Sequence, residues 1–363
     1  MSRFETRRDK LRRTVKRRGA EALLVTDVAN VTYLTGFTGD STYLLLRRDG
    51  ETLISDGRYT TQLGEECPGV DLEIRASNVN MCNSTSGVVR RAKVRNLAIE
   101  ADSMTVGFRE QLAEKLPGVE FMNTSGLLVE QRSCKDRDEI QRIRKAVRCA
   151  EKAFATVCAA LAPSKTEKDL ADELDSAMRR LGAQCASFPP IVAAGPRSAL
   201  PHASATKQPI GENGFLLIDW GARDDLYVSD LTRLVIRGKL SAKLRRVYSV
   251  VLEAQTKAIE AIRPGVAVKD LDAIARGVIT DAGFGRRFTH GLGHGIGLEV
   301  HENPRLSVLS DAVLRPGMVV TVEPGIYLPG WGGVRLEDDV LVTRNGHEVL
   351  SGAAKQLDEV MVG

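Results

Sequence analysis

The feature that most constrains this chain is a pair of aspartates inside an otherwise apolar hairpin pattern. Residues 214–236 (GFLLIDWGARDDLYVSDLTRLVI) form two strand-like segments around a turn signal at 223–225. A turn centred on 224–225 places Asp219 and Asp230 directly opposite each other on antiparallel strands, with Cβ atoms about 5 Å apart. Both strands are expected to be buried, and buried carboxylates this close either share a proton or hold a cation.

A second pair of acids repeats this arrangement further along the chain. Residues 318–323 (MVVTVE) and 334–343 (VRLEDDVLVT) are strand-like, and Glu323 and Glu337 are symmetric about Gly330 in the glycine-rich connection. These two glutamates are therefore also expected to converge. Four carboxylates on two hairpins make a hard oxygen site suited to two divalent ions.

Histidines are concentrated between the two hairpins. Residues 290–302 (HGLGHGIGLEVHE) hold three histidines, and the alternating glycines let the backbone approach closely. His294 is placed to supply one imidazole to a metal, and His290 and His301 to lie behind the ligands or on the substrate. His202, in an ALPH context, looks like an ordinary loop histidine by itself. A single histidine is usually structural, so the prediction depends on the whole set of acids and histidine occurring together.

Other polar residues near these motifs have ordinary interpretations. Asp224 and Asp225 are expected to be turn residues. Asp338 and Asp339 are expected to cap an element or face solvent, with the alternative that one of them lies behind a metal ligand. Arg335 is expected to be a counter-charge to the nearby carboxylates.

The chain is predicted to contain two domains, residues 1–132 and 133–363. In the first, helices and strands alternate in an α/β pattern. The expected helices are 3–18 and 108–116, and the expected strands are 22–26, 42–46, 52–55 and 96–100. In the second, the helices 137–160 and 166–180 are expected before the glycine-rich segments. Two further helices, 242–262 and 268–282, are expected between these segments.

Composition excludes several classes of protein. Hydrophobic residues make up 43% and charged residues 27%, which is typical of a globular chain. The six cysteines form no C-x-x-C pair and fit a reducing cytoplasm, and no apolar run is long enough for a transmembrane helix. Residues 1–18 hold nine Lys/Arg against two acids, which we interpret as a solvated helix face rather than a nucleic-acid contact.

The order Asp219, Asp230, His294, Glu323, Glu337 resembles that of the pita-bread metallopeptidase family. This family contains methionine aminopeptidases, Xaa-Pro aminopeptidases and prolidases (Xaa-Pro dipeptidases). The matching motifs are IDWG…SDLTR, GLGHGIGLEVHE, VEPG and GGVRLED, and the resemblance covers essentially the whole chain. The N-terminal domain is similar to that of the proline-specific branch; creatinases share the two-domain shape but lack the metal ligands.

The resemblance implies a fold and a metal centre. The fold is an α+β pita-bread (creatinase/aminopeptidase-like) catalytic domain preceded by a smaller α/β creatinase-type domain. Asp219 would chelate one divalent ion, Asp230 and Glu337 would bridge two, and His294 and Glu323 would complete the second. Manganese is favoured for both ions, and cobalt or zinc are alternatives.

The resemblance also implies an activity and roles for further residues. Glu323 would shuttle the proton, His301 would contact the substrate carbonyl, and His202 would line the proline side. His290 and Arg335 would complete the substrate-binding set. The expected activity is Xaa-Pro aminopeptidase, with Xaa-Pro dipeptidase as the alternative and a non-catalytic peptide- or nucleic-acid-binding protein as the rival. A cytoplasmic homodimer acting on proline-containing peptides, without a membrane or nucleic-acid partner, is expected.

Overall fold

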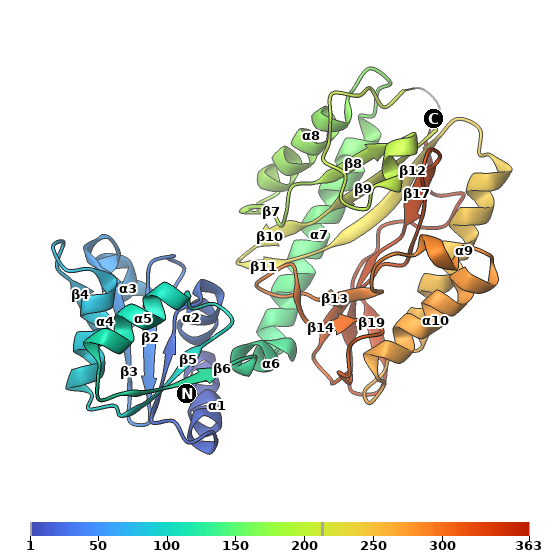
Figure 1. Ribbon diagram of the computed structural model, residues 1–363. Helices are drawn as coiled ribbons and strands as arrows, with labels where there is room; N and C mark the ends of the chain where they lie inside the picture. The colour runs from blue at the N-terminus through green and yellow to red at the C-terminus, as the bar shows by residue number, and fades with distance from the viewer. Residues whose placement is uncertain (1, 212–213, 363) are drawn as a thin grey trace. The chain divides into compact units, whose positions relative to one another are not determined.

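An α/β unit occupies the chain through Arg132, and a second, larger unit begins at Ser133 (Figure 1). The computed structural model describes residues 2–211 and 214–362. Each unit has its own hydrophobic core.

The first unit is built on a six-stranded mixed sheet in the order β4-β3-β2-β1-β5-β6. The central strand β1 runs antiparallel to β2 and parallel to β5. The strands are β1 (Ala22–Val25), β2 (Tyr43–Arg47), β3 (Glu51–Asp56), β4 (Asp71–Arg75), β5 (Asn96–Glu100) and β6 (Glu120–Thr124). The helices are α1 (Arg3–Arg17), α2 (Val28–Thr35), α3 (Thr60–Glu66), α4 (Met81–Arg91), α5 (Val106–Lys115) and α6 (Leu127–Ser133).

The basic helix α1 packs on its own unit. Leu11 and Val15 are buried on one face, as their helical spacing predicts. Arg8 is also turned inward, where its guanidinium donates to the backbone carbonyl of Leu34 at 2.8 Å. Part of the helix's positive charge, that of Arg8, is therefore buried inside the unit and does not face solvent.

The second unit consists of several small sheets flanked by two pairs of helices (Figure 1). The helices are α7 (Arg137–Ala159), α8 (Glu167–Arg180), α9 (Ala242–Glu260) and α10 (Val268–Asp281). The strands of the first half are β7 (Cys185–Ala186), β8 (Ile191–Ala194), β9 (Gly214–Trp220), β10 (Ala222–Asp224), β11 (Tyr227–Val228) and β12 (Leu231–Arg237). Those of the second half are β13 (Gly293–Gly295), β14 (Glu302–Leu306), β15 (Val319–Val322), β16 (Gly325–Leu328), β17 (Gly332–Arg335), β18 (Asp338–Val342), β19 (His347–Val349) and β20 (Met361–Val362).

Each helix pair of the second unit covers a different part of the strands. Helices α7 and α8 share a core with β8, β9 and β12, in which Trp220 stacks on Phe154 with ring centroids 4.1 Å apart. Helices α9 and α10 share a second core with β15 and β18. Asp136 and Thr166 cap the first pair through capping boxes, which fixes where these helices begin. The strands that carry the candidate ligands are thus held between two packed layers.

The four helices of the second unit agree with the sequence prediction to within two residues. In the first unit the helices α2, α3, α4 and α6 and the strands β4 and β6 were not predicted. Helix α4 is rich in Ser, Thr, Asn and Gly, which individually disfavour helix, but Asn80 caps it and Val88 and Val89 bury its inner face. In the part of the chain that the structure describes, no helix is both long and apolar enough to cross a membrane.

Candidate metal centre

The first pair of acids lies on the long hairpin of β9 and β12. The observed register pairs Asp219 with Thr232, so the expectation that Asp219 directly faces Asp230 is wrong by two residues. The turn is centred on Asp225 and Leu226, which both have positive φ (50° and 73°), one residue later than predicted. Asp230 nevertheless precedes Thr232 by two residues and so projects from the same face as Asp219.

The second pair of acids lies where two strand ladders meet. The ladders β15–β18 and β16–β17 share one register, which is symmetric about Gly330. Glu323 and Glu337 occupy the positions between the ladders, and this register places them opposite each other, as the sequence predicts.

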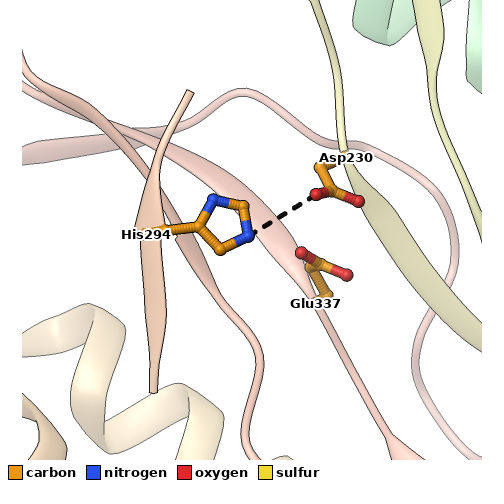
Figure 2. Close-up of side chains that lie close together, drawn as sticks. All are labelled: Asp230, His294 and Glu337. Carbon is orange, nitrogen blue, oxygen red and sulfur yellow. Dashed lines mark ion pairs between the residues drawn. The ribbon is translucent and has the colours of Figure 1, made fainter. Parts of the chain in front are cut away.

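His294, on β13, points its ring toward the acids (Figure 2). Its Nε2 lies 3.3 Å from Glu323 Oε1 and 3.7 Å from Asp230 Oδ2. Its Nδ1 lies 3.1 Å from the carbonyl oxygen of Gly295, a contact that fixes the ring and leaves Nε2 facing the carboxylates. One ligand atom each from Asp230, His294 and Glu337 fall within 4.8 Å of one another, so a single ion can reach all three.

The electrostatics of this cluster fit a cation. Burial raises the pKa of Asp230 and Glu337 well above their ordinary values, and the neighbouring carboxylates raise it further. Burial also raises the pKa of Asp219, whose Oδ1 is buried without a hydrogen-bond partner. For Glu323, burial is outweighed by the hydrogen bond and charge of His294, which lower its pKa to about 2. Buried carboxylates with unused lone pairs, together with one imidazole, are a donor set for hard divalent ions.

Arg335 joins the two pairs of acids from behind. Its Nη2 donates to Asp219 Oδ2 at 2.5 Å, and its Nε donates to Thr232 Oγ1 at 3.0 Å. Thr232 Oγ1 in turn donates to Glu337 Oε2 at 2.6 Å. Arg335 Nη1 donates to the hydroxyl of Tyr327 at 2.9 Å. Arg335 is therefore a counter-charge that orients Asp219, and its contact with substrate stays a prediction.

The other three predicted histidines surround the cluster. The ring of His301 lies edge-on to that of His294, with centroids 4.4 Å apart, and burial together with His294 lowers the pKa of His301 to about 4. His290 Nε2 lies 2.9 Å from the hydroxyl of Tyr327, and burial lowers the pKa of His290. His202 is exposed in the loop after the 3-10 turn at Gly195–Ala199 and lies close enough to Asp219 and His290 to interact electrostatically with both.

Three aspartates that we expected at turns or facing solvent are buried. Asp224 belongs to β10 and pairs with Lys145 Nζ at 2.9 Å. Asp338 is fully buried in an ion-pair network. Asp339, also fully buried, accepts the backbone N–H of Asp230 at 3.1 Å. Local polarity misled these expectations because the partners come from distant parts of the chain.

Sequence reasoning missed three residues that contact the cluster. Thr232 bridges Arg335 and Glu337 as described above, and the hydroxyl of Tyr327 lies between His290 and Arg335. Thr321 Oγ1 accepts the backbone N–H of His294 at 3.0 Å. Thr232 and Thr321 each lie two residues from a candidate ligand on the same strand face, so a period-two search around the ligands would have found them.

Comparisons with known proteins identify the family of this chain. The model of metallopeptidase family M24 matches residues 141–344, and the creatinase/prolidase N-terminal domain matches residues 7–134. The chain belongs to the M24 metallopeptidase family. The predicted two-domain pita-bread fold is thereby confirmed.

Relatives of this metallopeptidase match over nearly their whole length. An Xaa-Pro dipeptidase of Pyrococcus horikoshii is 37% identical over 338 residues, which are 93% of this chain and 94% of that protein. The structure of an Xaa-Pro dipeptidase from Bacillus anthracis has a TM-score of 0.94 and 36% identity and covers 99% of this chain and 100% of its own. The structure of an X-Pro aminopeptidase from Thermotoga maritima has a TM-score of 0.88 and 34% identity. It covers 94% of this chain and 99% of its own.

Proposed function

We propose that this M24 metallopeptidase hydrolyses the bond between an N-terminal residue and a following proline. The observation that carries the proposal is the convergence of Asp230, His294 and Glu337 on one point, with Asp219 and Glu323 beside them. Relatives that share more than a third of its residues over the same length are named for cleavage at Xaa-Pro.

Asp219, Asp230, His294, Glu323 and Glu337 would hold two divalent metal ions. Manganese is favoured over cobalt and zinc because four of the five ligands are carboxylates. When bound, such ions polarise the scissile carbonyl and lower the pKa of a bound water to about 7.

The remaining steps belong to side chains of the chain itself. A pKa of about 4 keeps His301 neutral at pH 7, so its ring would donate a hydrogen bond, not a proton, to the developing oxyanion. Glu323 would take the proton of the attacking water and return it to the leaving proline nitrogen. That nitrogen carries no hydrogen in the substrate, so His202 and its neighbours would recognise the shape of the proline ring.

Two substrate lengths are compatible with this site. The prediction of an aminopeptidase, which accepts residues beyond proline, stands beside that of a dipeptidase. The names of the Pyrococcus horikoshii and Bacillus anthracis relatives favour the dipeptidase, and that of the Thermotoga maritima protein favours the aminopeptidase.

The test is an assay of the manganese-loaded protein with matched peptides. Xaa-Pro and Xaa-Pro-Yaa peptides are compared with Xaa-Ala controls of the same length, and turnover of the proline peptides alone is expected. Turnover of dipeptides only would assign a dipeptidase. A folded, metal-bound protein that cleaves none of them would refute the proposal and favour the non-catalytic peptide- or nucleic-acid-binding alternative.

We further propose a homodimer that works in the cytoplasm. The cytoplasmic assignment is supported by six free cysteines, which include the buried thiols of Cys67, Cys82 and Cys149. The dimer is proposed by analogy with the family, and light scattering of the purified protein tests it directly. A single monomeric species at micromolar concentration would refute it.

A further inference from the structure

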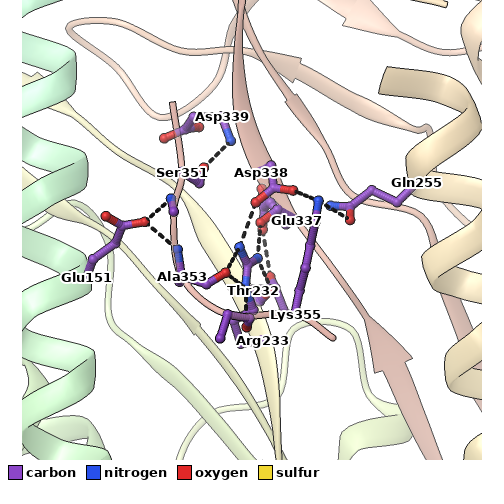
Figure 3. A network of polar contacts seen from close by, with 12 residues as sticks. Glu151, Thr232, Arg233, Gln255, Glu337, Asp338, Asp339, Ser351, Ala353 and Lys355 are labelled. Carbon is purple, nitrogen blue, oxygen red and sulfur yellow. Dashed lines mark hydrogen bonds and ion pairs between the residues drawn. The ribbon is translucent and has the colours of Figure 1, made fainter. Parts of the chain in front are cut away.

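An ion-pair network adjoins the candidate ligand Glu337 (Figure 3). Its charged members are Arg233, Asp338 and Lys355. Arg233 and Asp338 are joined at 2.6 Å, with 1% and 0% of their side chains exposed, and the other oxygen of Asp338 accepts from Lys355 Nζ. Asp338 directly follows the ligand Glu337, so the network begins one residue from the metal centre.

The guanidinium of Arg233 ties three segments of backbone together. Its Nη1 donates to the carbonyl oxygens of Glu337 at 2.5 Å and of Thr232 at 3.0 Å. Its Nε and Nη2 donate to the carbonyl oxygen of Ala353 at 3.0 and 2.8 Å. The backbone of the ligand Glu337 is therefore held against β12 and against residues 351–355.

Lys355 extends the network to the other glutamate ligand. Its Nζ donates to Gln255 Oε1 at 3.1 Å, and Gln255 Nε2 donates to the carbonyl oxygen of Val322 at 3.1 Å. Val322 immediately precedes Glu323. Tyr248 holds the backbone of Lys355 by donating its hydroxyl to the carbonyl oxygen at 2.9 Å. One connected set of side chains thus fixes the backbone at both Glu323 and Glu337.

The segment 351–355 that supplies Lys355 is anchored at its other residues too. Ser351 Oγ accepts the backbone N–H of Asp339 at 2.8 Å, and the backbone N–H of Ala353 donates to Glu151 Oε1 at 2.7 Å (Figure 3). The family model ends at residue 344, so this segment lies beyond the part that defines the family.

Stability alone does not account for three charges in this position. Buried ion pairs cost desolvation, and replacing a whole pair by apolar side chains of similar volume is often neutral or stabilising. The hydrogen bonds of such a network are directional, unlike an apolar contact, because each donor specifies where a carbonyl oxygen must lie. Here those carbonyl oxygens belong to Val322 and Glu337.

We propose that Arg233, Asp338 and Lys355 are positioning residues that set the spacing of Glu323 and Glu337 for metal binding. Residues 351–355 are accordingly part of the metal-binding machinery. This inference rests on the metal centre of the proposed function and not on the identity of the substrate.

The test measures Mn²⁺ affinity of the full chain after removal of metal with EDTA. Lys355→Met removes one cation from the network and is expected to weaken the binding of at least one ion by about tenfold or more. Lys355→Arg restores the charge and is expected to stay within about threefold of wild type. Arg144→Met is the matched control, because it removes a cation from the Arg144–Glu348 pair between α7 and β19; its Mn²⁺ affinity is expected to be unchanged.

Calorimetric titration gives the affinities, and thermal melting of the metal-free variants gives their stabilities. The melting temperature of Lys355→Met is expected within about 4 °C of wild type, because Lys355 is 24% exposed and Arg233 still neutralises Asp338. Unchanged Mn²⁺ affinity in Lys355→Met, an equal loss in Arg144→Met, or no recovery in Lys355→Arg would each overturn the proposal. If Lys355→Met does not fold, Asp338→Asn provides the same comparison with little change of shape.

The same titration separates this inference from the proposed function. Wild-type protein that binds Mn²⁺ but cleaves no Xaa-Pro peptide would refute the substrate and leave the positioning role intact. Wild-type protein that binds no Mn²⁺ would refute the metal centre itself.

Discussion

Two kinds of buried carboxylate lie close together in the second unit, and they differ in what neutralises them. Burial alone would raise the pKa of Asp338, but the charges of Arg233 and Lys355 lower it below its ordinary value. Asp230 is as deeply buried, yet burial and the charge of Glu337 raise its pKa well above its ordinary value. Cationic side chains of the chain neutralise Asp338, whereas the ionisable neighbours of Asp230 are other carboxylates and His294, so that Asp230 is suited to bind a metal cation. This difference separates structural acids from ligands.

Removal of an uncompensated acid is expected to have the largest effect. Asp230→Asn should lower metal content and reduce peptide hydrolysis by more than about 100-fold, because a bridging charge is lost. After EDTA treatment the same variant should melt at a higher temperature than wild type, because a neutral amide removes the cost of burying Asp230 among other carboxylates. Metal analysis, activity and calorimetry check these outcomes. A variant that keeps its metal and its activity would show that Asp230 is not a ligand.

Removal of a compensated acid that has no contact with the candidate ligands or with the network that adjoins them is expected to act on stability alone. Glu167 is fully buried and accepts from Arg197 Nε at 2.9 Å and from the backbone N–H of Ala194 at 2.8 Å. Glu167→Gln leaves the guanidinium without its partner and should lower the melting temperature by roughly 5 °C or more, with or without metal. Metal content measured by elemental analysis should be unchanged. If the variant instead loses metal at wild-type stability, the division into two kinds of acid fails.

A smaller effect is expected from substitution of Thr232, a neutral side chain that connects Arg335 to Glu337. Thr232 Oγ1 donates to Glu337 Oε2 at 2.6 Å and accepts from Arg335 Nε at 3.0 Å. Thr232→Val keeps the shape but removes this link, and Mn²⁺ affinity should fall by about tenfold. Thr232→Ser, which keeps the hydroxyl, is the control and should bind Mn²⁺ like wild type. Equal affinities for the Val and Ser variants would mean that Glu337 is oriented without Thr232.

The residues that the sequence placed correctly are those governed by local periodicity. Glu323 and Glu337 converge as predicted because one turn at Gly330 sets a single register through two ladders. Asp219 and Asp230 were placed on the correct face but two positions out of register. Each of the polar residues at 223–225 can lie in the turn, and a one-residue shift of the turn's centre moves each pair by two.

What the sequence could not give was the set of contacts between distant segments. Arg233, the partner of Asp338 on β12, lies 105 residues away in the sequence. Nothing in the pattern EDD distinguishes a buried acid from an exposed one. Tyr327 was missed for the same reason, since its role depends on Arg335 lying between the two hairpins. Ligand types follow from motifs, whereas the residues that orient ligands follow from packing.

The smallest expected effect is a pH dependence of the metal-free protein. In the unfolded chain Asp230 ionises near its ordinary pKa of 3.8, whereas in the folded chain it keeps its proton to a higher pH. Its contribution to stability is therefore present below pH 3.8 and is lost as the pH rises through the raised pKa. His290 and His301, whose folded pKa values are lowered, change stability in the opposite sense near their ordinary value of 6.5.

Comparison of wild type with Asp230→Asn, both treated with EDTA, isolates the aspartate from these histidines, which both proteins share. The melting temperature of the variant should exceed that of wild type by an increment of a few degrees that grows as the pH rises above 3.8. Saturating Mn²⁺ should reverse the order of the two proteins, because only wild type gains the full binding energy of the ions. Differential scanning calorimetry at several pH values measures both trends. An increment that stays constant over this range would mean that Asp230 is already ionised and compensated inside the chain, as Asp338 is.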